Sequence, residues 1–204
     1  MRWFVGVLAT TLVMCLPRPA AAQWQFKPFV GATYNGSTTF VIANLDQAVE
    51  HPHFAFGGSA SYLGEIFGLE ADFSHAPSFF QRGSQPVSNS QPGIVNSGVT
   101  TFTGNVIVAL PRHLTEYTLR PYIVGGAGMM HVTLEDLLGV FQVSQNFKTM
   151  DLGGGVTGFL TRRVGVSWDV RYFRTIDRTI ENGFSFESEH VSFWRASMAM
   201  AIRL

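Results

Sequence analysis

The sequence predicts an all-β fold, an eight-stranded antiparallel up-and-down β-barrel that spans a membrane. Eight segments of about ten residues alternate apolar and polar side chains, which is the length that a tilted membrane strand requires. Charged residues make up only 14% of the chain, against roughly 25% in soluble domains. Beyond the N-terminal region, no stretch approaches the about 18 uninterrupted apolar residues of a spanning helix. A membrane crossing by this chain therefore requires a closed barrel.

The N-terminus has the features of a secretory signal peptide. Arg2 supplies the positive charge, residues 3–16 form an uncharged and mostly apolar run, and Ala20-Ala21-Ala22 offers a cleavage site of small residues. The apolar run is shorter than the about 20 residues that a permanent membrane anchor needs. We therefore expect residues 1–22 to be a signal peptide and residues 23–204 to form one barrel domain.

The composition of the remaining chain excludes several kinds of protein. Its only cysteine, Cys15, lies inside the signal, and Met14 precedes it where a lipoprotein would carry a small residue. The exported chain then has no disulfide, thiol nucleophile or cysteine-bound metal. The full chain has 14 basic and 14 acidic residues, and removal of Arg2 and Arg18 with the signal leaves 12 basic and 14 acidic residues, a net charge of −2. This balance provides no electrostatic footprint for nucleic acid.

The eight predicted strands share a period of two, which assigns their side chains to two faces. In the clearest of them, Trp168 and Val170 point one way while Asp169 and Arg171 point the other. A soluble sandwich strand could show the same pattern, so the repetition along the whole chain matters more than one segment. The strands are predicted at residues 26–34, 54–63, 67–75, 100–110, 121–132, 150–160, 164–173 and 191–204.

The links between these strands alternate in length. Short periplasmic turns and long extracellular loops are typical of outer-membrane barrels, and this pattern places both termini in the periplasm. Aromatic residues near strand ends are expected to form the girdles at the two membrane interfaces. The long links are 35–53, 76–97, 133–148 and 175–190, the short ones are 64–66, 111–120 and 161–163, and the expected girdle residues are Trp24, Tyr34, Tyr62, Tyr122, Tyr172 and Trp194.

Three segments carry a resemblance to a known family. Residues 120–128 read RPYIVGGAG, residues 157–172 read TGFLTRRVGVSWDVRY, and the last strand has apolar residues at alternate positions through Leu204. The chain resembles the opacity/OmpA-like family of small outer-membrane barrels over nearly its whole exported length. The resemblance implies the outer membrane of a Gram-negative-type bacterium, with lipid and lipopolysaccharide around the barrel. It also implies that barrel-insertion machinery recognises the last strand.

The predicted facing gathers charged side chains in the lumen. Charges in a narrow lumen are costly unless they are paired and hydrogen-bonded, and an eight-stranded barrel is just wide enough for side chains to fill it. We therefore expect a lumen charge network rather than an open channel. Its inward acids are Glu70, Asp72, Asp151 and Asp169, and its inward bases are Lys27, Arg171, Arg195 and Arg203.

Two heights are expected within this network. Glu70, Asp72, Asp169 and Arg171 fall near mid-barrel, whereas Asp151 and Arg195 fall together nearer the long loops. The core of the network is thus Glu70, Asp72, Asp151, Asp169, Arg171 and Arg195. Lys27 and Arg203 could instead line water at the barrel mouths.

Two further groups could carry chemistry. Glu50-His51-Pro52-His53 offers a carboxylate and two histidines, but a metal site needs a fuller set of ligands. In Glu189-His190-Val191-Ser192, a period of two puts His190 and Ser192 on one face, the arrangement of a base and a nucleophile. Barrel enzymes that deacylate lipid A use such a pair. Glu189 would point to the opposite face, so no third group orients the histidine. We predict no enzymatic activity, no metal and no cofactor.

The leading hypothesis is a non-enzymatic outer-membrane barrel with a side-chain-filled lumen. It would contribute to envelope structure, or to surface interaction with an extracellular ligand through four long loops. The alternatives are a narrow pore, a lipid A-modifying barrel enzyme, and a secreted soluble barrel that binds an apolar ligand. The soluble barrel would reverse the two faces, with aliphatic side chains inside and charges outside.

Overall fold

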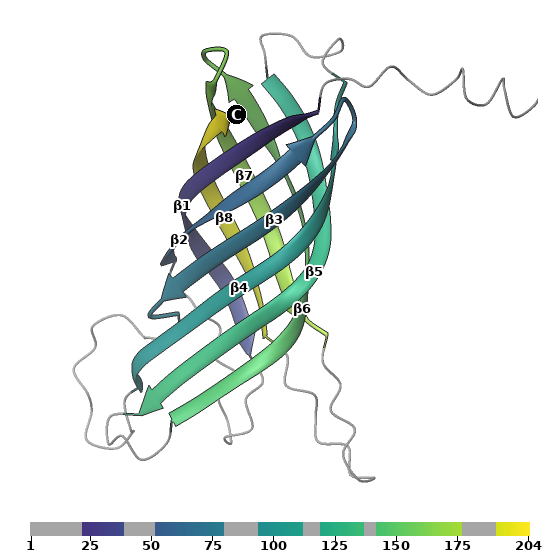
Figure 1. Cartoon of the computed structure of the whole chain (residues 1–204). Helices are drawn as coiled ribbons and strands as arrows, with labels where there is room; N and C mark the ends of the chain where they lie inside the picture. The colour runs from purple at the N-terminus through teal and green to yellow at the C-terminus, as the bar shows by residue number, and fades with distance from the viewer. Residues whose placement is uncertain (1–21, 39–51, 80–93, 112–118, 137–141, 177–190) are drawn as a thin grey trace, which may run out of the picture.

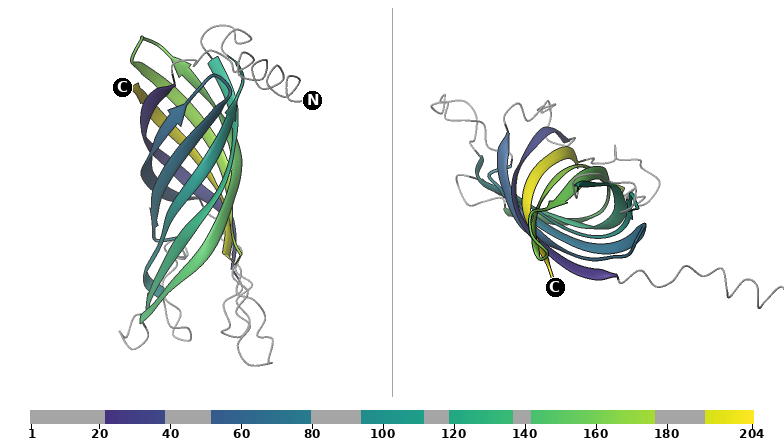
Figure 2. Two further views of the ribbon diagram at one scale, coloured as in Figure 1. Left: turned by 45° about the vertical axis from the view of Figure 1, so that its right-hand side comes forward. Right: turned by 90° about the horizontal axis from the view of Figure 1, so that it is seen from above.

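The computed structural model describes residues 22–38, 52–79, 94–111, 119–136, 142–176 and 191–204. Eight strands form one closed sheet in which each strand is antiparallel to its neighbours in sequence, and β1 pairs with β8 to close the barrel. The strands are tilted and surround a central lumen (Figures 1 and 2). They are β1 (Gln23–Thr38), β2 (His53–Leu63), β3 (Phe67–Pro77), β4 (Ile94–Ala109), β5 (Leu119–Asp136), β6 (Gln142–Phe159), β7 (Val164–Thr175) and β8 (Val191–Arg203).

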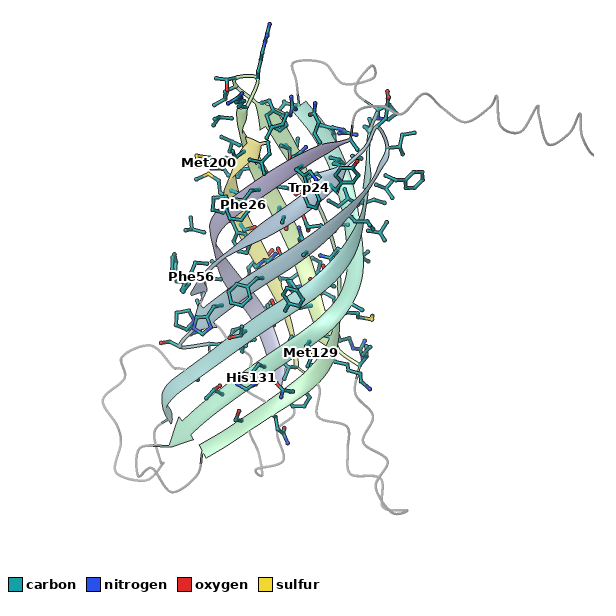
Figure 3. The ribbon with its side chains drawn as sticks, in the orientation of Figure 1. Trp24, Phe26, Phe56, Met129, His131 and Met200 are labelled. Atoms are coloured by element: carbon teal, nitrogen blue, oxygen red, sulfur yellow. The ribbon has the colours of Figure 1, made fainter. Side chains whose placement is uncertain are left out.

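The alternation of side chains produces an apolar exterior and a polar interior. On β3, Phe67 and Leu69 are 67% and 63% exposed, whereas Glu70 and Asp72 are buried in the lumen. Large exposed apolar side chains continue around the barrel, and Figure 3 shows Phe26, Phe56 and Met200 pointing away from it. An exterior of this kind suits lipid rather than water. It contradicts the alternative of a soluble barrel, which required charges outside and aliphatic residues inside.

The two ends of the barrel differ in their connections. One end, which we call the turn end, holds the start of β1, the end of β8 and the strand ends that residues 64–66, 110–118 and 160–163 connect. The opposite end, which we call the loop end, holds the strand ends that residues 39–52, 78–93, 137–141 and 176–190 connect. In Figure 1 the turn end is at the top, together with the C-terminus.

One predicted long link is wrong. Residues 133–148 lie mostly within β5 and β6, and only 137–141 connect these strands. The ladder continues because polar residues pair across it, with Thr133 opposite Ser144. The expected alternation of long and short links therefore fails here, since the turn-end link 110–118 is longer than 137–141. As a result, β5 and β6 extend one wall of the barrel at the loop end (Figure 1).

Aromatic pairs lie on the outer surface near both ends. The rings of Trp24 and Tyr62 are 5.3 Å apart on the turn-end side, and those of Tyr172 and Trp194 are 5.1 Å apart towards the loop end. Such pairs are expected at the two interfaces of a membrane. Tyr122 does not belong to them, because its side chain is buried in the lumen. Among the described residues, no helix is long and apolar enough to cross a membrane.

Candidate functional site

The lumen is filled by three layers of side chains. A charged layer, which we call the central network, consists of Lys27, Glu70, Asp72, Asp151, Asp169, Arg171 and Arg195. The turn-end layer consists of Leu63, Ile107, Ala109, Tyr122 and Val124. The loop-end plug consists of Ala55, Ala76, Phe79, Val99, Met130, Val132, Phe147, Phe173, Val191 and Phe193.

Arg171 on β7 is the hub of the central network. Its Nη2 lies 2.7 Å from Oε1 of Glu70, and its Nε donates to Oδ1 of Asp169 at 2.6 Å. Its Nη1 lies 3.7 Å from Oδ2 of Asp151 and 3.8 Å from Oδ2 of Asp72. One guanidinium therefore faces four carboxylates that come from β3, β6 and β7. Because its fork of donors is planar and rigid, arginine suits such a multiple role better than lysine.

Arg195 and Lys27 complete the charge pairing from the side of the barrel where β8 and β1 meet. Arg195 donates through Nη1 and Nη2 to the two oxygens of Asp72, at 2.8 and 3.0 Å. Its guanidinium also lies 4.5 Å from the ring of Phe29. The Nζ of Lys27 lies 3.3 Å from Oε2 of Glu70, and the lysine is buried rather than lining water at the mouth.

The two heights expected within the network are joined by direct contacts. Arg195 reaches Asp72 directly, and Asp151 faces Arg171, so the six predicted residues lie in one connected group. Arg203 lies apart from that group, at the turn end, where its guanidinium is 3.8 Å from the ring of Phe159.

Neutral side chains that the sequence analysis did not assign to the network extend it. The hydroxyl of Tyr122 donates to Oδ2 of Asp169 at 2.8 Å, and Ser59 donates to Glu70 at 3.2 Å. The Asn105 amide is oriented by its partners: its oxygen accepts from Arg171 and its nitrogen donates to Asp151, each at 2.9 Å. These contacts satisfy oxygens that the cations do not reach, which lowers the cost of burying the charges.

Two glycines on the inward face of β6 make room for this network. A Cβ at Gly153 would clash with the backbone of β7 and lie 2.8 Å from Cγ of Arg171. A Cβ at Gly155 would clash with the backbone of β7 and lie 2.7 Å from the hydroxyl oxygen of Tyr122. Larger residues would therefore displace β7 together with Arg171 or Tyr122. The glycine run of β6 thus serves close packing of the lumen.

Arg120 closes the lumen on the turn-end side. It is buried and donates to the backbone carbonyls of Leu110, Gly64 and Glu65. It thereby ties the start of β5 to the turn between β2 and β3. A small hollow remains beside it, lined among others by Gln25, Lys27 and Phe159.

Phe79 fills the lumen on the loop-end side. Ser78 has a positive φ of 59° and donates its N–H to the carbonyl of Ser97 at 2.6 Å, which turns the chain inward directly after β3. The ring of Phe79 is then 5.0 Å from that of Phe193, which stacks on Phe173 at 5.1 Å. Phe79 is only 1% exposed. The three aromatic rings therefore cover the central network on its loop-end side.

The residues considered for chemistry are only partly described. His53 faces the lumen near Phe79, with ring centroids 6.2 Å apart, and Ser192 lies on the outward face of β8. Glu50, His51, Glu189 and His190 lie outside the described residues. No group of three or more potential metal-ligating side chains occurs within the described part of the chain.

Taken together, the lumen holds four carboxylates and three cations in its central network, enclosed by apolar layers at both ends. The paired groups are almost completely buried, so their interactions are strong. Sequence comparison identifies the type of protein. The model of the outer membrane protein beta-barrel domain matches residues 7–193.

The chain belongs to this outer-membrane barrel family. The family places it in the outer membrane of a Gram-negative bacterium, surrounded by lipid. Among curated proteins, none matches the chain.

Solved outer-membrane barrels share the fold at low sequence identity. Neisserial surface protein A is 14% identical with a TM-score of 0.61, over 89% of this chain and 97% of that one. OprG from Pseudomonas aeruginosa is 13% identical with a TM-score of 0.52, over 91% and 97%. The N-terminal β-barrel domain of Pseudomonas aeruginosa OprF is 14% identical with a TM-score of 0.51, over 89% and 97%. At this identity the likeness concerns the fold alone.

Proposed function

We propose that this protein is a non-conducting, non-enzymatic outer-membrane barrel that contributes to envelope structure or binds surface ligands through its loop end. The central network carries the proposal, because Arg171 and Arg195 join carboxylates from three strands across the lumen. Because the interior of the barrel is occupied by side chains, we expect ligands to bind at its outer surface or at the links between its strands. The links concerned are 39–52, 78–93 and 176–190, next to the raised β5–β6 hairpin.

The two ends of the chain carry features suited to export and to insertion into the outer membrane. We propose that residues 1–22 are removed, since β1 begins directly at Gln23. On β8, Trp194, Met198 and Met200 face outward, a pattern suited to recognition by barrel-insertion machinery. Both ends of the exported chain lie at the turn end, which we assign to the periplasm.

The filled lumen leads to a direct electrical prediction. Protein refolded and inserted into a planar lipid bilayer should give no stable openings, because the paired charges and the loop-end plug leave no continuous water column. A large porin recorded in the same membrane serves as the positive control. Frequent, long-lived and ion-selective openings of this protein would contradict the proposal and favour the narrow pore.

The proposed orientation can be tested by chemical labelling of intact cells. Gln145 is exposed at the loop end and Thr161 at the turn end. With a membrane-impermeant maleimide, the Gln145→Cys variant should react in intact cells. The Thr161→Cys variant should react only after the outer membrane is permeabilised. The unsubstituted chain, whose single cysteine is Cys15, is the control and should stay unlabelled. The opposite labelling pattern would place the loop end in the periplasm.

A further inference from the structure

The outward face of β5, β6 and β7 changes from apolar to polar near the loop end. Along each strand, one step of the two-residue period separates the last apolar side chain from a basic one. Figure 3 shows this step on β5, where both side chains point outward. Within the strands, the last apolar outward positions are Met129, Met150 and Tyr172, and the next outward positions are His131, Lys148 and Arg174. Directly after β7, the exposed Ile176 adds one apolar side chain next to Lys148.

The barrel geometry brings these basic residues together. Lys148 pairs with Met129, and Arg174 pairs with Met150, so Arg174 lies diagonally across the ladder from Lys148. Diagonal neighbours of this kind are about 7–8 Å apart at their backbones. Their long side chains can therefore converge on one small anion. Because the strands are tilted, such diagonal positions also lie at similar heights in the membrane.

A polar ladder continues this surface on the side of β5. The Nδ1 of His131 lies 2.7 Å from Oδ1 of Asn146, and Oγ of Ser144 lies 3.3 Å from its Nε2. These contacts fix the imidazole above the apolar band. The side chains of His131, Ser144 and Asn146 therefore form a row of hydrogen-bonding groups beside Lys148.

Two positive charges lie on this face where its polar part begins. Lys148 and Arg174 are both exposed and face outward at the edge of the apolar band. A ligand that matches this surface carries negative charge directly above a hydrocarbon layer.

We propose that Lys148 and Arg174 bind a phosphate of lipid A, the phosphorylated glycolipid of the outer leaflet. Arginine and lysine are the side chains that bind phosphate most strongly through charge-assisted hydrogen bonds. The proposal rests on the proposed function, because it requires the loop end to face the cell exterior. The acyl chains of the lipid then lie along the apolar band formed by Met129, Met150 and Leu152.

The test measures lipid binding by the mature barrel in detergent, using native mass spectrometry. The probes are lipid A with both phosphates, dephosphorylated lipid A, and phosphatidylglycerol. The test variant is Lys148→Gln/Arg174→Gln. The matched control is Arg162→Gln/Arg163→Gln, which removes the same charge from exposed residues at the turn end. Heat-dependent electrophoretic mobility verifies that each variant forms the barrel.

We expect the unsubstituted barrel to bind phosphorylated lipid A in preference to the other two probes. Since each basic residue near an anionic lipid surface contributes about 1 kcal/mol, the test variant should lose about tenfold or more in affinity. The control variant should bind phosphorylated lipid A as the unsubstituted protein does.

Three results would overturn the proposal. Unchanged affinity of the test variant would mean that the two side chains only reach the headgroup region without binding a phosphate. Equal loss in the control variant would indicate a non-specific charge effect. Equal binding of phosphatidylglycerol would assign the site to anionic lipid in general. If the loop end faces the periplasm instead of the cell exterior, the labelling of Gln145→Cys and Thr161→Cys in cells will be reversed. That result would be distinguishable from a failure of lipid binding.

Discussion

Replacement of Arg171 by methionine is expected to lower the free energy of unfolding of the refolded barrel by about 3–5 kcal/mol. The substitution keeps an unbranched side chain but removes the cation that faces Glu70, Asp72, Asp151 and Asp169. These carboxylates are almost completely buried, so water cannot replace the lost partner. Urea unfolding in lipid vesicles, followed by tryptophan fluorescence, measures the change.

The Arg162→Met variant is the matched control for the loss of an arginine. Arg162 is exposed in the turn between β6 and β7, and its replacement should change the free energy of unfolding by less than about 0.5 kcal/mol. A second variant tests the cause. Asp169→Asn in the Arg171→Met background removes one stranded charge and still accepts the hydrogen bond from Tyr122. It should recover part of the lost stability. If both arginine variants unfold at the same urea concentration, the central network does not stabilise the barrel.

The inward facing of the charged residues could be predicted from the sequence. A period of two fixes the face of every side chain once one charged residue is assigned to the lumen. On β3 from Phe67 to Ser74, and on β7 from Val164 to Tyr172, apolar residues alternate with polar residues or glycine. The common inward facing of Glu70, Asp72, Asp169 and Arg171 therefore needed no knowledge of the neighbouring strands.

The partners within the lumen could not be predicted in the same way. Which residues meet depends on strand tilt and stagger, which the period does not contain. Asp72 and Arg195 come from β3 and β8, yet they form a bidentate pair across the lumen. The contacts that join Asp151 and Arg195 to the other charged residues could not be read from the period for this reason.

The inward position of Tyr122 could have been predicted from its neighbour Arg120. From Pro121 to Val124 every residue is apolar or aromatic, so alternation within this run does not assign Tyr122 to either face. Arg120, however, shares the face of Tyr122, and an arginine on the lipid face is costly. That argument assigns the tyrosine to the lumen, where it is found.

The length of β5 and β6 was missed for a different physical reason. Beyond Met129 and Met150 the outward residues become polar, because that part of the hairpin extends past the apolar band. On β5 the alternation continues with its faces reversed, because Met130 and Val132 face inward while His131 and Thr133 face outward. Residues 131–135 pair with residues 142–146 through their backbones and through the His131–Asn146 contact. A search for strands with an apolar outward face does not find this pairing.

The lipid-facing stripe of β8 gives the second large expected effect. Met198 lies midway between Trp194 at the loop-end girdle and Ile202 at the turn end, and its side chain is exposed on the outer surface. Met198→Arg should lower the free energy of unfolding in lipid vesicles by about 2–4 kcal/mol, because the charge would lie near the centre of the bilayer. Urea titration of the refolded variant measures this loss.

The loss of stability caused by an arginine on the outward face of β8 should depend on the depth of the substituted residue in the membrane. Met200 lies one step closer to the turn end (Figure 3), so Met200→Arg should cost less than Met198→Arg as the charge approaches the interface. Between them, Ala199 faces the polar lumen opposite Ser167, and Ala199→Ser should be nearly silent. Equal costs for the two arginine variants would argue against this depth in the membrane. A large cost for Ala199→Ser would argue against the facing of β8, since a hydroxyl beside Ser167 has a hydrogen-bonding partner within the lumen.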